Sequence, residues 1–260
     1  MLAEAALTEL PLWAGLALLA LAGAVAAVIN TMAGGGSLLT IPVLIGLGLP
    51  PGLANGTLRV GVAVQNAASV ITFHRRGVRA YRPFLRLVVP MVVGAAGGTA
   101  LATRLPDDSL RIVFGVMLAA WAVVLVLRPG RFLESPTEPR PVGWLALVLS
   151  ALIGIYGGFL QAGVGFPLLA LLVTYLGHEA VVANAIKMML VLAYTAISLP
   201  MFALAGQVAW REGLALAAGA MVGGWLGTRL QLRVGAKLVR WVVVIAVGIS
   251  GIAMLRGALG

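Results

Sequence analysis

The sequence predicts an all-α integral membrane protein made of two inverted structural repeats, each with about four full transmembrane helices and one short broken half-helix. Three observations predict this fold: the composition, a series of long apolar runs, and an internal duplication. The chain of 260 residues is 61% hydrophobic and 10% charged, and its mean hydropathy is +1.06. A soluble domain carries about 25% charged residues, so the composition excludes a soluble fold.

Apolar runs separated by polar loops give the elements. A bilayer core of about 30 Å needs roughly 18 or more apolar residues in one helix. The runs cover residues 11–33, 38–49, 53–73, 84–103 and 110–127 in the first half, and 142–162, 166–176, 180–205, 213–232 and 238–255 in the second. The runs 38–49 and 166–176 are too short to cross alone and are flanked by glycine and proline, so we expect half-helices there.

The two halves are joined by a segment of different composition. Residues 128–141 (RPGRFLESPTEPRP) are rich in proline and charge, which is typical of a linker. We therefore divide the chain into an N-terminal repeat (1–127), a cytoplasmic linker (128–141) and a C-terminal repeat (142–260). Residues 1–10 carry two glutamates and no cation, unlike a secretory signal, so we expect the first apolar run to be retained as a helix.

The two halves align without a gap in the register that pairs Asn55 with Asn184. Over positions 33–113, 25 of 81 residues are identical to their equivalents in this repeat alignment, against roughly a tenth expected from so skewed a composition. Shared hydrophobicity would match alanine and leucine, but the identities include polar residues. Besides the asparagines, these polar pairs are Ser69 with Ser198, Thr99 with Thr228, Arg82 with Arg211, Arg104 with Arg233, and Arg111 with Arg240.

Loop cations favour an inverted relation between the repeats. The loop near residues 75–86 holds five arginines, and its counterpart near 204–215 holds one; the bias is reversed in the loops near 104–111 and 229–240. An odd number of crossings per repeat gathers 12 cations on one side and 4 on the other, and an even number gives 10 and 6. Cytoplasmic loops carry the excess of Lys and Arg, so we expect inverted repeats with both termini outside the cytoplasm.

Composition also excludes several kinds of site. The chain has no cysteine, and His74 and His178 are its two histidines, so we expect neither a metal site nor a cofactor. The net charge of +10 lies mostly in loops between apolar runs, where it reports membrane orientation and not nucleic-acid binding. The expected partners are a small anionic substrate and the lipid bilayer, with a homodimer as a possible assembly.

Glycine-rich breaks precede both short segments. Gly34, Gly35, Gly36 and Ser37 stand before the first, and Gln161, Gly163 and Gly165 stand before the second. Backbone broken at membrane depth is tolerated where it is buried in protein or lines a watery cavity, and such paired breaks point to a transporter's binding site. The alternative is close helix packing through small residues, which we expect for Gly94 with Gly98 and for Gly223 with Gly227.

Two cations lie inside apolar runs. Arg59 follows Asn55 by one turn, and Lys187 follows Asn184 by three residues; Asn66 and Tyr194 continue the two polar stripes at helical spacing. Buried ionisable residues in membranes are functional candidates by default, and snorkelling to the interface is the alternative. All eight acidic residues fall in predicted ends or loops, which favours an anionic substrate. The predicted substrate-binding residues are Gly34, Gly35, Gly36, Ser37, Asn55, Arg59, Asn66, Gln161, Gly163, Gly165, Asn184, Lys187 and Tyr194.

The residues resemble a known family. The segments 33–42 (AGGGSLLTIP), 154–166 (GIYGGFLQAGVGF), 183–187 (ANAIK), 206–210 (GQVAW) and 227–230 (GTRL) resemble the TauE/SafE sulfite exporter family of membrane permeases, over residues 20–256. The resemblance implies an exporter of sulfite, sulfoacetate or related organosulfonates in the bacterial inner membrane. Gln161 and Ala162 depart from the pattern, because many relatives have further small residues there.

We therefore expect a secondary transporter that works by alternating access. The alternatives are a passive anion channel and a permease for another small anion. An intramembrane enzyme would need a nucleophile with a base, or a metal centre, and no acidic residue or histidine lies within a predicted span. We do not expect an enzyme.

Overall fold

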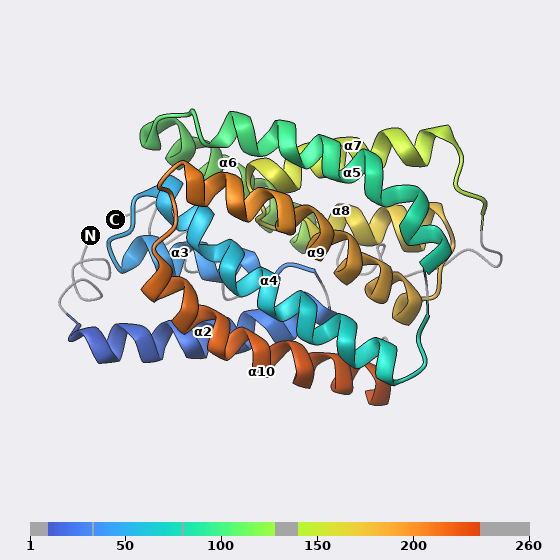
Figure 1. Cartoon of the computed structure of the whole chain (residues 1–260), viewed down its shortest axis with the longest axis horizontal. Helices are drawn as coiled ribbons and strands as arrows, with labels where there is room; N and C mark the ends of the chain where they lie inside the picture. The colour runs from blue at the N-terminus through green and yellow to red at the C-terminus, as the bar shows by residue number, and fades with distance from the viewer. Residues whose placement is uncertain (1–9, 33, 80, 128–139, 235–260) are drawn as a thin grey trace.

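A computed structural model describes residues 10–32, 34–79, 81–127 and 140–234. These residues form helices that run along the long axis of the molecule (Figure 1). The first half contains α2 (Leu12–Met32), α3 (Ser37–Gly46), α4 (Pro51–Arg75), α5 (Tyr81–Ala102) and α6 (Asp107–Leu127). The second half contains α7 (Trp144–Phe159), α8 (Gly165–Leu169), which continues into the π-helical η2 (Ala170–Tyr175), α9 (Ala180–Leu204) and α10 (Trp210–Val234).

The predicted half-helices are present in both halves. The helix α3 has 10 residues, and α8 with η2 spans 165–175. At 1.5 Å per residue each is roughly 15 Å long, about half of a bilayer core. Each is the short element between two longer helices, as the sequence predicts.

The turns that end the helices are duplicated along with the sequence. Glycines with positive φ occur in three pairs that are equivalent in the repeat alignment, and a residue with a side chain is disfavoured in that conformation. The pairs are Gly34 (φ 95°) with Gly163 (71°), Gly48 (91°) with Gly177 (74°), and Gly77 (83°) with Gly206 (70°). The helices α4 and α9 both have 25 residues, and their first residues, Pro51 and Ala180, are also equivalent.

The matching helices α4 and α9 cross in opposite directions. Arg59, near the start of α4, lies over the ring of Phe202, near the end of α9. Phe73, near the end of α4, is buried in a cluster with Ala185 and Met188, near the start of α9. Figure 1 shows the same opposition for α2 and α7, which run in opposite directions along the molecule.

The helices α2 and α10 pack closely through glycine. A Cβ atom on Gly219 would meet the carbonyl oxygen of Ala20, and one on Gly227 would lie 3.0 Å from Cα of Val28. Because residue numbers increase in the same direction along both helices, from Gly219 at Ala20 to Gly227 at Val28, the two helices are parallel. The predicted packing role of Gly223 and Gly227 is confirmed, since added Cβ atoms there would press on α2.

The helices α5 and α7 form the equivalent pair. A Cβ on Gly94 would meet the carbonyl oxygen of Ala151, and one on Gly98 would meet that of Ile155. Gly158 makes the reciprocal approach to Ala95. The predicted packing role of Gly94 and Gly98 is also confirmed. Both close pairs therefore join a helix of the first half to a helix of the second.

The outer faces of these helices suit lipid. Large apolar side chains point outward, whereas a water-soluble surface rarely exposes large contiguous apolar patches. They include Leu21 and Val25 on α2, Val89 and Val93 on α5, and Leu152 and Ile155 on α7. Within the described residues, three segments are long and apolar enough to cross a membrane by length and composition: Leu12–Met32, Arg82–Ala102 and Ala180–Leu204. The all-helical membrane fold is thus confirmed, while most of the linker and the run 238–255 lie outside the described residues.

The two ends of the bundle differ in charge. Leu232 of α10 packs with Val78 and Val181 against Phe73, so the α4–α5 loop, the start of α9 and the end of α10 share one end. In the described residues this end carries Arg75, Arg76, Arg79, Arg82, Arg86, Arg140 and Arg229, with Glu179 as its acid. The opposite end carries Arg104, Arg111 and Arg211 with Asp107, Asp108 and Glu212.

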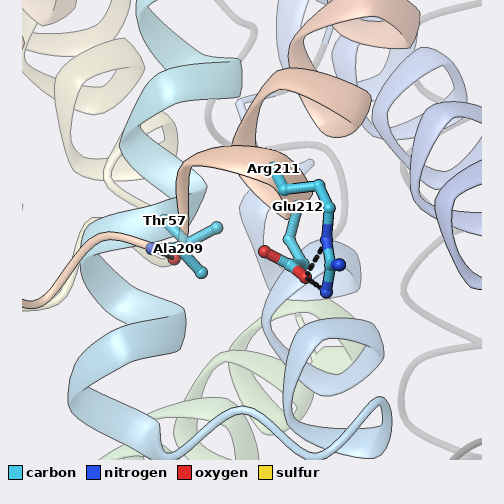
Figure 2. A network of polar contacts seen from close by, with 4 residues as sticks. All are labelled: Thr57, Ala209, Arg211 and Glu212. Atoms are coloured by element: carbon cyan, nitrogen blue, oxygen red, sulfur yellow. Dashed lines mark hydrogen bonds and ion pairs between the residues drawn. The ribbon is translucent and has the colours of Figure 1, made fainter. Parts of the chain in front are cut away.

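At the less charged end, a hydrogen bond joins the start of α10 to α4, and an ion pair lies beside it on α10. The backbone N–H of Ala209 donates to Oγ1 of Thr57 (2.9 Å), which anchors the first turn of α10 (Figure 2). Beside it, the exposed guanidinium of Arg211 pairs with Glu212 at 2.8 Å. The equivalent of Glu212 in the first half is Pro83, so Arg82 has no adjacent carboxylate on its own helix.

Substitution at the α5–α7 contact should destabilise the fold. Gly94→Val would press a side chain on the Ala151 carbonyl, and such overpacking costs roughly 1–3 kcal/mol. Gly97→Val on the same helix is the control, because nothing lies within 4 Å of a Cβ there. In detergent, we expect a Tm several degrees lower for Gly94→Val and near the wild-type value for Gly97→Val. Equal melting temperatures would contradict the contact.

Candidate functional site

The glycine turns of the two halves meet in the structure. A Cβ on Gly34 would lie 2.6 Å from the carbonyl carbon of Gly165, so the two backbones touch. Ser37 Oγ donates to the carbonyl oxygen of Gln161 and accepts from the N–H of Gly163, both at 3.2 Å. The N-terminal ends of the half-helices α3 and α8 therefore lie together, and helix N-termini carry partial positive charge.

Gly35 and Gly36 are enclosed by protein atoms. A Cβ on Gly35 would meet the ring of Phe166, and one on Gly36 would meet the carbonyl oxygen of Ala26 and lie 2.8 Å from Cβ of Asn30. These glycines are therefore needed for close packing, which is the alternative that the sequence leaves open. Their predicted role in substrate binding stays a prediction.

Arg59, on α4, is fully buried, and its guanidinium lies against the C-terminal end of α7. Its Nη2 donates to the carbonyl oxygens of Gly157 (3.2 Å) and Gly158 (2.6 Å), and its guanidinium carbon lies 4.5 Å from the centre of the Phe202 ring. The C-terminal end of a helix carries partial negative charge, so the cation stabilises the place where α7 breaks. Arg59 does not snorkel to the interface.

Gln161 links Arg59 to the second half. Its Oε1 accepts hydrogen bonds from Arg59 Nη1 (3.3 Å) and from the hydroxyl of Tyr194 (2.8 Å). Its backbone φ is +61°, and among the described residues Gln161 is the one non-glycine residue with a positive φ. Such strain persists where the surroundings over-determine it, and it is common at functional sites.

Lys187, on α9 of the second half, makes a related contact with α2 of the first half. Its side chain is 1% exposed, and Nζ donates to the carbonyl oxygen of Asn30 at 2.7 Å, one turn from the end of α2. Each buried cation therefore reaches from one half to the helix of the other half that precedes a glycine break. Arg59 and Lys187 are the buried charged residues among those described.

One of the three predicted asparagines reaches another helix, and the other two bond within their own helices. Asn55 Nδ2 donates to the carbonyl oxygen of Phe159 at 2.7 Å, beside Arg59's contacts. Asn66 and Asn184 donate to carbonyl oxygens of their own helices at 2.7 and 3.1 Å. The Oδ1 atoms of all three are buried without a protein partner.

The structure thus brings most of the predicted residues together and leaves some apart. The meeting point of the half-helices gathers Gly34, Gly35, Gly36, Ser37, Asn55, Arg59, Gln161, Gly163, Gly165 and Tyr194. Lys187 joins this region through α2, whereas Asn66 and Asn184 bond within their own helices. The sequence analysis missed Asn30 and Phe202; a polar residue at the end of an apolar run could have indicated Asn30.

His178 lies outside the helices, in the loop between η2 and α9. Burial lowers the pKa of its imidazole from the ordinary value, so the side chain is neutral at pH 7. Its Nε2 atom is buried without a partner. The structure thus places His178 outside the predicted spans, as the apolar runs indicate.

Removal of the Arg59 guanidinium should destabilise the fold. Arg59→Met deletes charge-assisted hydrogen bonds to the end of α7, each worth about 1.5–3 kcal/mol. Arg86→Met is the control, because Arg86 is exposed. We expect a lower Tm for Arg59→Met in detergent and an unchanged Tm for Arg86→Met. A wild-type Tm for both would mean that the guanidinium contributes little to holding α7.

Comparison with known proteins gives a consistent assignment. The family described as "Sulfite exporter TauE/SafE" matches residues 19–254. A protein of Haemophilus influenzae named "Probable membrane transporter protein" is 28% identical over 230 residues, covering 88% of this chain and 90% of that protein. "Probable membrane transporter protein ORF9" of Sinorhizobium sp is 29% identical and covers 88% of each chain.

A third relative comes from Escherichia coli K12. This "Probable membrane transporter protein YfcA" is 28% identical over 233 residues, covering 89% of this chain and 86% of its own. No solved structure matches the chain. The family match covers nearly the whole sequence and agrees with the resemblance seen in its glycine motifs, and the relatives share its length. The chain belongs to the TauE/SafE sulfite exporter family and is a membrane transporter.

Proposed function

We propose that the protein is a secondary transporter that exports small sulfur-containing anions, such as sulfite or sulfoacetate, by alternating access. The observation that carries the proposal is the meeting of the half-helix N-termini at Gly34 and Gly165, with Arg59 close by. Backbone N–H groups and the positive ends of helix dipoles attract anions. The family description supports sulfur oxyanions as the substrate class.

The distribution of charge supports an anionic substrate. No acidic side chain is buried among the described residues, and the buried charges there are those of Arg59 and Lys187. Cation transporters and proton relays ordinarily place carboxylates within the membrane. The proposed binding residues are the predicted set, centred on the glycine turns with Asn55, Arg59 and Gln161. We propose no catalytic step and no cofactor.

We also propose that the halves are inverted repeats. The paired positive-φ glycines and the antiparallel crossing of α4 and α9 support this relation. Inverted repeats allow a site at their interface to open alternately to each side of the membrane. The membrane potential, negative inside, would assist anion export by about 2.3 kcal/mol per charge per 100 mV.

The charge difference between the ends sets the proposed orientation. The arginine-rich end that holds the α4–α5 loop faces the cytoplasm by the positive-inside rule. The other end balances its described cations with acids, as in the Arg211–Glu212 pair. The helix α2 begins at that end, because it runs parallel to α10, which supports an extracytoplasmic N-terminus in the inner membrane. The predicted extracytoplasmic C-terminus lies outside the described residues and stays a prediction. The homodimer stays a prediction.

Cysteine labelling tests the inverted arrangement. Arg76 and Ala205 are exposed, equivalent in the repeat alignment and placed at the ends of α4 and α9, and the native chain has no cysteine. In intact cells, we expect a membrane-impermeant maleimide to label Ala205→Cys. We expect it to label Arg76→Cys only after the cells are permeabilised. Labelling of both variants from the same side would indicate parallel repeats.

Flux measurements test the transport proposal. Purified protein in liposomes should move sulfite and sulfoacetate with a rate that saturates, whereas a passive channel would show a rate that rises without saturation over the same range. We expect Lys187→Met to lower the saturating flux about tenfold or more, since it removes a buried charge worth about 1.5–3 kcal/mol in hydrogen bonding. Arg111→Met, an exposed charge at one end, is the control and should retain wild-type flux.

A further inference from the structure

A narrow, partly open cavity lies between α2, α3 and α4 of the first half and α10 of the second. Its polar lining consists of Asn30, Ser37, Thr40 and Gln65, and glycine, alanine, leucine and valine form the remainder. Gly61 and Gln65 lie at the middle of the 25-residue helix α4. The cavity is therefore at the mid-depth of the bundle, where a transporter of broken helices holds its substrate.

Gln65 presents an unused hydrogen-bond donor to this cavity. Its side chain is 4% exposed, and its Oε1 accepts from Asn30 Nδ2 at 3.2 Å. With Oε1 in this bond, Nε2 has no partner in the protein. A buried N–H group without an acceptor costs about 1–3 kcal/mol, so the site favours a ligand that supplies acceptor oxygens.

The surroundings of the cavity favour a negative ligand. The helix α3 begins at Ser37 without a side-chain cap, and its first turn lines the cavity through Gly36, Ser37 and Thr40. Lys187 Nζ lies 2.7 Å from the carbonyl oxygen of Asn30, a residue that lines the cavity. No acidic residue lines it. A helix N-terminus, a nearby ammonium and an amide donor all suit an oxyanion.

The corresponding space in the second half is occupied by large side chains. In the repeat alignment, the equivalents of Ala27, Ser37 and Gln65 are Tyr156, Phe166 and Tyr194. Tyr194 is fully buried and donates to Gln161, and the Phe166 ring packs 4.9 Å from that of Trp121. Small residues in the first half thus leave a cavity that aromatic rings fill in the second.

We propose that the cavity beside Gln65 is the substrate subsite, and that it binds one small oxyanion per chain with the Gln65 amide as a donor. This inference rests on the proposed function and deepens it, because it places the anion on the side of the predicted site where Gly36 and Ser37 face α2, α4 and α10, and not beside Arg59. Gln65, Asn30 and Thr40 determine its position, together with the first turn of α3.

Anion binding to the purified full chain tests the inference. The probes are sulfite, sulfoacetate, sulfate and phosphate, each measured by titration calorimetry in detergent. Gln65→Met keeps the length of the side chain and removes the donor. Gln231→Met is the matched control, since Gln231 is also buried with one amide atom unpartnered and lies outside the cavity, near the end of α10.

We expect wild-type protein to bind one anion per chain, and Gln65→Met to raise the Kd about tenfold or more while Gln231→Met leaves it unchanged. Three results would overturn the subsite: wild-type affinity in Gln65→Met, equal weakening of binding in both variants, or two anions bound per chain. In each case, saturable flux would leave the transport proposal intact. Absence of binding of every probe to wild-type protein would overturn the subsite, and absence of flux would overturn the proposed function separately.

Discussion

The need to satisfy backbone groups at helix breaks inside the bilayer governs this structure. A transmembrane helix bonds its own carbonyl groups, but α2 and α7 stop at glycine turns, where the carbonyls of the last turn have fewer helical partners. The carbonyl of Asn30 accepts from the N–H of Gly34 at 3.0 Å as well as from Lys187. Side chains from the opposite half supply donors there: Arg59 and Asn55 to the end of α7, and Lys187 to the end of α2. The buried cations thus have a structural task whether or not they also touch a substrate.

Close approach of helices is the second condition for this arrangement. The donors reach the breaks because glycines let α2 lie on α10 and α5 lie on α7 at backbone distance. Each pair takes one helix from each half, so the tightly packed bodies are not the sequence repeats. If one body moves against another during transport, the contacts that change are those of α3, α8 and the crossing of α4 with α9, where the polar side chains lie.

Much of this fold could be predicted from the sequence, because its signals are local. Apolar runs indicated the helices, glycine and proline indicated the half-helices, and the register of the duplication reappears in positive-φ pairs such as Gly77 with Gly206. The partners of the polar residues could not be predicted, because they depend on helix crossings. Asn55 and Asn184 are identical in the alignment, yet one reaches α7 and the other bonds within its own helix. The role of Gln65 could not be predicted either, because the lack of a partner for its Nε2 atom is apparent from the contacts in the structure alone.

The pairing of α2 with α10 also has a consequence for synthesis. Ala24 packs against Gly223, so partners in this close helix contact are separated by most of the chain. At about 5–20 residues per second, the ribosome needs on the order of 10–40 s to make the intervening segment. During that time the glycine face of α2 has no native partner in the membrane, and lipid or a membrane-resident insertion factor must cover it. The fold can close only after nearly the whole chain has been inserted.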